Sequence, residues 1–146
     1  MAFDFRLATV DEVDQIASIE MESMPNPWKA DSYIEAINSD HAFVMVAMDD
    51  KRVAGYAVFY LTPPEAELPD IVVDLEYRGK GLGRSLLTEA FAALSKNSID
   101  TVFLEVRESN AAARSLYNSL GFEEIGKRKY FYSNPVEDAI CMSLHM

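Results

Sequence analysis

The sequence of 146 residues contains one cysteine, two histidines and no long apolar run. A single cysteine, Cys141, cannot form an internal disulfide, which excludes a disulfide-stabilised scaffold and agrees with a reducing cytoplasm. His41 and His145 lie far apart in the sequence without partners at ligand spacing, so no metal site is expected. The longest uncharged stretch, residues 53–64, is too short to span a bilayer. No signal-peptide pattern is visible near the first residue.

Basic residues are also few, 13 against 24 acidic residues, and the isoelectric point is near 4.5. This balance argues against nucleic acid as the main partner. Hydrophobic residues make up 49% of the chain and charged residues 25%, which is ordinary globular composition. Since there is no internal repeat or flexible linker, residues 1–146 are expected to form a single domain.

Hydrophobic periodicity predicts seven strands and four helices. The expected strands cover residues 3–8, 42–48, 53–61, 67–74, 101–107, 123–132 and 139–145. The first expected helix begins after Thr9, which forms a capping-box pattern with Glu12. The other three cover residues 31–37, 82–95 and 109–122. The mixed order of strands and helices predicts an α/β or α+β fold, with one sheet that carries helices.

Three glycines spaced two apart, in the sequence RGKGLG of residues 78–83, lie between a predicted strand and a predicted helix. The backbone N–H groups at a helix N-terminus favour an anion, and glycine lets the backbone approach a ligand closely. Arg78, Lys80 and Arg84 add charge-assisted hydrogen bonds that suit phosphate. The spacing is neither that of a P-loop nor G-x-G-x-x-G. A pyrophosphate site is favoured over a solvated turn.

Two side chains in the second half of the chain have an open interpretation. Glu105 interrupts an otherwise apolar strand, and it is either used chemically or paired with Arg107 or Arg114. Tyr117 shares a helical face with apolar residues, which is typical of a core aromatic residue. Covalent catalysis by Cys141 is not favoured, because His145 is too far along the strand to pair with it.

Several motifs resemble one known family. Residues 78–83 resemble the R/Q-x-x-G-x-G/A acetyl-CoA loop of GNAT-type N-acetyltransferases. LEVRESNAAARSLYNSLGF (104–122) resembles the corresponding block of the RimI-type ribosomal-protein-alanine N-acetyltransferases, as do NPWKADSY (26–33) and NPVEDAICM (134–142). These blocks run in the family's order from the second loop to the end of the chain. The resemblance implies a GNAT fold, with a mixed, mostly antiparallel sheet of about seven strands flanked by about four helices.

The resemblance also implies roles for individual residues. Glu105 would be the general base and Tyr117 the general acid. Asn110 would contact the cofactor, although it is also a candidate helix N-cap. The backbone of residues 71–73 would line the inserted acetyl-CoA and form an oxyanion site. The expected cofactor-binding residues are Ile71, Val72, Val73, Arg78, Gly79, Lys80, Gly81, Leu82, Gly83, Arg84 and Asn110.

The acceptor side of the site is expected at Trp28, Tyr130 and Tyr132, which match segments that flank the peptide in the family. A tryptophan such as Trp28 is more often a core residue than a contact residue. The family hairpin usually has Asn-Tyr-Tyr, so Tyr130 and Phe131 depart from it. Asp70 stands where the family usually has asparagine, and it is the second candidate for the general base.

The resulting hypothesis is a cytoplasmic, acetyl-CoA-dependent Nα-acetyltransferase that needs no metal. It would transfer acetyl directly to the N-terminal Ala or Ser of a ribosomal or other cytoplasmic protein. Acetylation of a lysine side chain or of a small-molecule amine is the first alternative. A non-catalytic sensor that binds acyl-CoA is the second alternative, and the presence of both Glu105 and Tyr117 argues against it. Neither nucleic acid nor a membrane is an expected partner.

Overall fold

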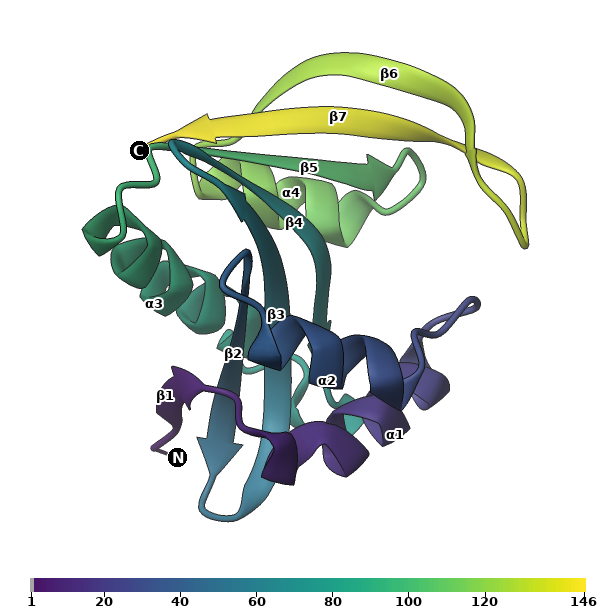
Figure 1. Cartoon of the computed structure of the whole chain (residues 1–146). Helices are drawn as coiled ribbons and strands as arrows, with labels where there is room; N and C mark the ends of the chain where they lie inside the picture. Colours follow the sequence, from purple (N-terminus) through teal and green to yellow (C-terminus); the bar gives the residue numbers. More distant parts are fainter. Residues whose placement is uncertain (1) are drawn as a thin grey trace.

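The computed structural model describes residues 2–146 (Figure 1). One seven-stranded sheet runs through the molecule in the order β1-β2-β3-β4-β5-β7-β6, and its pairs are antiparallel except β4 with β5. The strands are β1 (Asp4–Leu7), β2 (Ala42–Asp49), β3 (Arg52–Thr62), β4 (Glu65–Val73), β5 (Thr101–Arg107), β6 (Glu123–Tyr132) and β7 (Glu137–His145). The helices are α1 (Val13–Ser23), α2 (Ala30–Asn38), α3 (Leu82–Lys96) and α4 (Ala111–Ser119), with short 3₁₀ turns η1 (Val10–Glu12) and η2 (Leu75–Tyr77). The predicted mixed sheet with about four helices is confirmed.

The helices lie in two layers on opposite faces of the sheet (Figure 1). On one face, α1 and α2 bury Ile16 and Tyr33 against β2 and β3. On the other face, α3 packs Leu86 and Leu87 against the sheet, in a larger core that also includes Tyr117 of α4. The apolar residues of α3 recur at helical spacing, so that burying this stripe against the sheet stabilises both elements.

Element ends agree with the sequence patterns to within three residues, and the largest difference is at the end of α4. The capping box at Thr9 is present, because its side chain accepts a hydrogen bond from a backbone amide and Glu12 bonds back to its N–H. Gly121 has a φ of 103° immediately after α4, as expected of a C′ glycine. β4 begins at Glu65, two residues earlier than predicted, because only the two-proline turn separates it from β3.

An extra residue in β4 changes the direction of the side chains that follow it. Val58 of β3 pairs with Asp70, but Tyr60 pairs with Glu67, so one β3 residue faces two β4 residues in between. One of these two is Pro69, which cannot donate to a ladder hydrogen bond and suits a bulge. Leu68 consequently packs on the α3 face, whereas Asp70 contacts α2 on the opposite face.

The parallel pair at the centre of the sheet separates soon after it forms. β4 pairs with β5 only where residues 65–67 face residues 101–103. Beyond this point β4 continues along β3, while β5 continues along β7. The two halves of the sheet therefore diverge, and the backbone of residues 71–73 has a strand partner on one side only.

Candidate active site

A cavity of about 620 Å³ lies where β4 and β5 diverge. Its lining comes from the end of α1, β4, the glycine loop, β5, α4 and the end of β6. Most of the predicted site residues meet there. They are Ile71, Val72, Val73, Arg78, Gly79, Gly81, Leu82, Gly83, Arg84, Glu105, Asn110, Tyr117 and Tyr132.

The open edge of β4 presents backbone amide groups to this cavity. The N–H of Asp74 donates to Ala54 of β3 at 2.8 Å. Because successive N–H groups of a strand point to opposite edges, those of Ile71 and Val73 point away from β3, toward the divergence. These two amides are thus available to a ligand that extends along β4.

The glycine loop leads into a helix N-terminus that is open to an anion. Gly79 and Gly81 have φ angles of +78° and +76°, a backbone conformation that favours glycine. Among the described residues, none caps α3 through its side chain, and its first turn contains no acid. By contrast, Asn110 caps α4 by accepting from the N–H of Ala113. Unpaired amides and the helix dipole at this point fit the pyrophosphate of acetyl-CoA.

The three basic side chains of the loop differ in their surroundings. Arg78 is held by the protein itself, since its guanidinium donates to the carbonyl of Val73 at 2.9 Å and to the hydroxyl of Ser23 at 3.2 Å. Arg84 lines the cavity and donates to the hydroxyl of Ser119. Lys80 does not line the cavity, and its ammonium lies 5.8 Å from the centre of the Tyr77 ring.

Glu105 lies on the open face of β5, within the cavity lining. Its side chain is 32% exposed, so it is not the fully buried carboxylate that the apolar strand suggested. The alternative of an ion pair with Arg107 or Arg114 is wrong, because these residues pair with Glu137 and Glu124. The guanidinium of Arg128 approaches Glu105 at 3.9 Å from β6. Glu105 can therefore contact solvent and ligand together.

Tyr117 enters the cavity from α4 and is 7% exposed. Burial, followed by the nearby Tyr132 and Asp70, raises the pKa of Tyr117 above its usual range. Burial also raises the pKa of Tyr132 to about 12, with a further contribution from the charge of Glu105. Both hydroxyls thus remain protonated around neutral pH, as proton donors must.

Two of the three predicted acceptor residues lie outside the cavity lining. Trp28 packs between aromatic rings, with Tyr33 at 5.5 Å and Tyr60 at 6.2 Å. Tyr130 is 78% exposed on β6, and its backbone N–H donates to Asp138 at 2.9 Å. The third residue, Tyr132, lines the cavity.

Arg107 is a cavity residue that the sequence reasoning missed as a part of the site. Its guanidinium donates to the backbone carbonyls of Pro135 and Ser133 at 3.0 and 2.9 Å, and to the carboxylate of Glu137 at 3.3 Å. It also lies 4.5 Å from the centre of the Tyr132 ring. Arg107 therefore fixes the β6–β7 turn. The available signal was a charged residue at the end of an otherwise apolar strand.

Replacing Arg107 with methionine is expected to raise KM for the acceptor at least about tenfold, while KM for acetyl-CoA changes little. The variant loses charge-assisted hydrogen bonds that contribute about 1.5–3 kcal/mol each, and 1.4 kcal/mol corresponds to about a factor of ten. Steady-state kinetics with each substrate varied in turn measures the two values. The control is Arg6→Met on β1, which removes the ion pair between Arg6 and Glu12. Equal changes in both KM values would contradict this role.

The comparisons with known proteins agree with this geometry. The model of the acetyltransferase (GNAT) family matches residues 13–122. The chain belongs to this family. The resemblance drawn from the glycine loop and from residues 104–122 is thereby confirmed, as is the expectation of an N-acetyltransferase that uses acetyl-CoA.

Individual members of the GNAT family are similar over nearly the whole chain. The [ribosomal protein bS18]-alanine N-acetyltransferase of Escherichia coli is 37% identical over 129 residues, which cover 86% of each chain. The crystal structure of the E. coli ribosomal-protein-S18-alanine N-acetyltransferase superimposes with a TM-score of 0.91, at 32% identity, over 99% of this chain and 94% of that one. The ribosomal-protein-alanine N-acetyltransferase from Brucella melitensis gives a TM-score of 0.84 at 25% identity, over 98% and 99% of the two chains.

Residues 2–146 contain neither a metal-binding cluster nor a membrane-spanning helix. No three side chains of His, Cys, Asp or Glu in this part of the chain gather as a metal site would require. None of its helices has the length and the apolar character needed to traverse a bilayer.

Proposed function

We propose that this GNAT enzyme is a cytoplasmic Nα-acetyltransferase that acetylates the N-terminal alanine or serine of a ribosomal protein. The main support is the similarity to the E. coli bS18-alanine N-acetyltransferase, which extends over 86% of both sequences and nearly all of the fold. Residues from both motifs, 78–83 and 104–122, line the same cavity. Bacterial bS18 is accordingly the first acceptor to test.

In the proposed mechanism, acetyl-CoA supplies the thioester, and the residues of the chain position it and move two protons. The amides at the start of α3 hold the pyrophosphate, and those of Ile71 and Val73 hold the pantetheine arm and the thioester carbonyl. Glu105 accepts a proton from the acceptor ammonium, directly or through water, so that the amine can attack. Tyr117 donates a proton to the departing thiolate and regains one from the attacking nitrogen as the amide forms, so that the proton accepted by Glu105 is the one released to solvent.

The chemistry of the acceptor favours an α-amine over a lysine side chain. An α-ammonium has a pKa of about 7.7–8.0, whereas that of lysine is about 10.4. One carboxylate of ordinary basicity therefore suffices for the former. Asp70 is a weaker candidate for the base, because burial and the neighbouring Glu20 raise its pKa to about 8 and keep it protonated at neutral pH.

Two loops approach each other at the acceptor end of the cavity. The side-chain amide of Asn26, between α1 and α2, donates to the carbonyl of Ser133 at 3.3 Å and accepts from Asn134 at 3.0 Å. In Figure 1 the β6–β7 turn reaches toward the α1–α2 connection. Loops joined in this way would leave room for the free end of a chain more readily than for the middle of a chain. This supports the assignment to N-termini.

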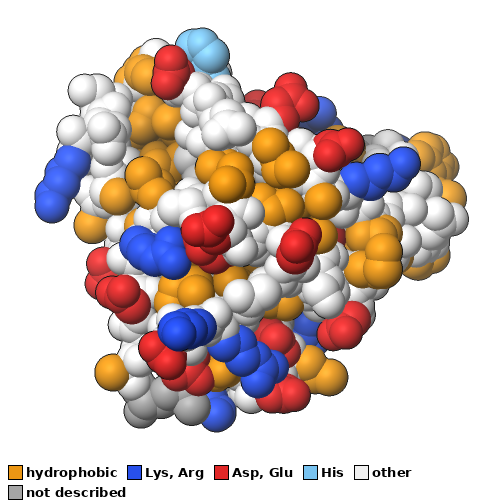
Figure 2. All heavy atoms as spheres, turned by 60° about the horizontal axis from the view of Figure 1, so that its bottom comes forward, with side chains coloured by type: hydrophobic (Ala, Val, Ile, Leu, Met, Phe, Trp, Pro, Cys, Tyr) orange, Lys and Arg blue, Asp and Glu red, His pale blue; other side chains and the backbone are white. Residues whose placement is uncertain are grey.

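Surface charge does not identify the acceptor. On the face shown in Figure 2, acidic and basic side chains are interspersed rather than gathered into one acidic patch. The net charge of −11 would suit a basic protein tail, but solubility accounts for it equally well.

A pair of peptides tests this function. A basic peptide that begins with alanine is expected to be acetylated, whereas the same peptide with a blocked N-terminus and intact lysines is not. Consumption of acetyl-CoA and the mass of the product measure both reactions. Turnover of the blocked peptide would move the function to lysine. Binding of acetyl-CoA without turnover of any amine would favour the sensor.

A further inference from the structure

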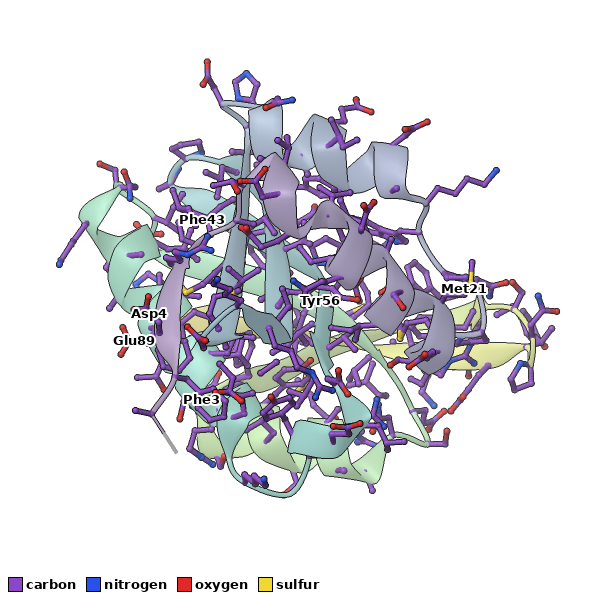
Figure 3. All side chains as sticks on the ribbon, turned by 90° about the horizontal axis from the view of Figure 1, so that it is seen from below. Phe3, Asp4, Met21, Phe43, Tyr56 and Glu89 are labelled. Atoms are coloured by element: carbon purple, nitrogen blue, oxygen red, sulfur yellow. The ribbon has the colours of Figure 1, made fainter. Side chains whose placement is uncertain are left out.

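A group of buried polar side chains lies beside the cavity, between the sheet and helices α1 and α2. Glu20 of α1 is 1% exposed and Asp70 of β4 is 4% exposed. The hydroxyl of Tyr56 donates to Glu20 at 2.9 Å, and that of Tyr33 donates to Asp70 at 3.0 Å. Figure 3 shows Tyr56 near the centre of the molecule, whereas Met21, the next residue of α1 after Glu20, lies at its periphery. Two carboxyl groups thus share one interior site.

This site contains more acceptors than donors. No Lys, Arg or His among residues 2–146 forms an ion pair with Glu20 or Asp70. Within the same part of the chain, Oδ1 of Asp70 is buried without a hydrogen-bond donor. An unpaired buried carboxylate oxygen costs free energy of folding. One proton held between two neighbouring carboxyl groups supplies the missing donor and removes the repulsion between their charges.

The titration of Asp70 agrees with this geometry. Burial raises its pKa most, and Glu20 raises it further through a hydrogen bond and its charge, to about 8. The hydrogen bond from Tyr33 acts in the opposite direction but is outweighed. This raised pKa keeps the Asp70 carboxyl group protonated at neutral pH, next to Glu20.

We propose that Asp70 is a positioning residue for the acceptor, and that a proton shared with Glu20 ties β4 to the α1–α2 loop. Asp70 and the next residue, Ile71, both line the cavity. Glu20 accepts a hydrogen bond from the backbone N–H of Trp28 at 3.0 Å, in the loop that leads into α2. The shared proton therefore connects the strand that holds the cofactor with the loop at the acceptor end. The kinetic part of this inference depends on the proposed function.

Loss of the shared proton would leave two adjacent anions in a nonpolar interior. The titratable groups that face Asp70 are all acidic: Glu20 from α1, Tyr33 from α2, Tyr56 and Tyr60 from β3, and Tyr117 from α4. None of them offsets the additional charge, so α1 and its loop are expected to move away from β4. KM for the acceptor then rises as the pH passes about 8.

Asp70→Asn separates this effect from titration of the acceptor. Asparagine has the same shape and donates a hydrogen bond without ionising, and the resembling family usually carries it at this position. For the wild type, KM for the alanine peptide is expected to rise about tenfold from pH 7 to 9, since about one molecule in ten retains the proton one unit above its pKa. For Asp70→Asn the same ratio is expected to be near one. Glu65→Gln, an exposed residue on the same strand, should behave as the wild type. Equal ratios for wild type and Asp70→Asn would overturn the positioning role.

Infrared difference spectroscopy tests the shared proton without any acceptor. The carbonyl band of a protonated carboxylic acid is expected at pH 7 in the wild type, to disappear above about pH 8, and to be missing in Asp70→Asn. Glu20→Gln should shift its disappearance to lower pH, because the neighbouring charge is removed. Absence of the band from the wild type at pH 7, or its persistence in Asp70→Asn, would overturn the proposal. Failure to acetylate any N-terminus would contradict the proposed function instead, and the infrared band would still decide the shared proton.

Discussion

Glu105→Gln is expected to lower kcat/KM for a free N-terminal peptide by about 10²–10³-fold at pH 7, within the usual contribution of a general base. Glutamine has the size of glutamate but accepts no proton at this pH. The side chain of Glu105 lies on the cavity and is partly exposed, so that water or the acceptor amine can reach it. Rates at saturating acetyl-CoA, with the peptide concentration varied, measure the loss.

The pH dependence identifies the cause of this loss. An α-ammonium has a pKa of about 7.7–8.0, so above this range the amine is already deprotonated and the base is no longer needed. The deficit of Glu105→Gln should therefore shrink as the pH rises from about 7 to 9. The matched control is Glu89→Gln, on the exposed side of α3. In Figure 3 Glu89 lies on the opposite side of the molecule from Met21 of α1, the helix whose end lines the cavity, so this change should not alter the rate. A deficit that stays constant with pH would argue for a structural role of Glu105.

Tyr117→Phe is expected to lower kcat by about 10–10²-fold, a smaller effect than that of Glu105→Gln. A thiol has a reference pKa of about 8.5, so a thiolate can depart without a proton donor, although more slowly. Because burial raises the pKa of Tyr117, the wild-type donor stays protonated up to alkaline pH and should give no alkaline loss of its own. Pre-steady-state rates of acetyl transfer in a single turnover measure this step.

The control for Tyr117 must separate chemistry from packing, because the ring contacts Phe122 at a centroid distance of 5.6 Å in the core. Phenylalanine keeps this contact, so the melting temperature of Tyr117→Phe should remain close to that of the wild type. A large fall in melting temperature together with the rate would show that the hydroxyl supports the fold rather than the reaction.

Local sequence signals were sufficient for the elements and for much of the cavity lining. The apolar stripe of α3, the capping box at Thr9 and the C′ glycine at Gly121 each depend on neighbours within a few residues along the chain. The motif of residues 78–83 likewise predicts an anion site from local sequence, because glycines that precede a helix start favour anion binding wherever the helix lies. The roles of Glu105 and Tyr117 came from the resemblance and stay predictions.

Contacts between distant segments were beyond these signals. The apolar pattern around Glu105 suggested burial, but the face of β5 that bears it is covered only in part. Arg107 looked like a partner for Glu105, yet it reaches the β6–β7 turn instead. Arg78 looked free to bind phosphate, but it is held by the backbone of Val73 and by Ser23. Each of these two arginines has several oxygen acceptors within its range, and only the fold selects among them.

The sequence by itself thus determined the family, the sheet with its four helices and the position of the cofactor loop, because these depend on patterns within short stretches of chain. The tertiary structure alone decided which way Asp70 points. Without the extra residue in β4, its side chain would lie on the α3 face beside Leu68. With it, Asp70 meets Glu20 from a helix fifty residues earlier in the chain. Strand register and the meeting of distant elements arise from the packing of the whole sheet, which no short segment encodes.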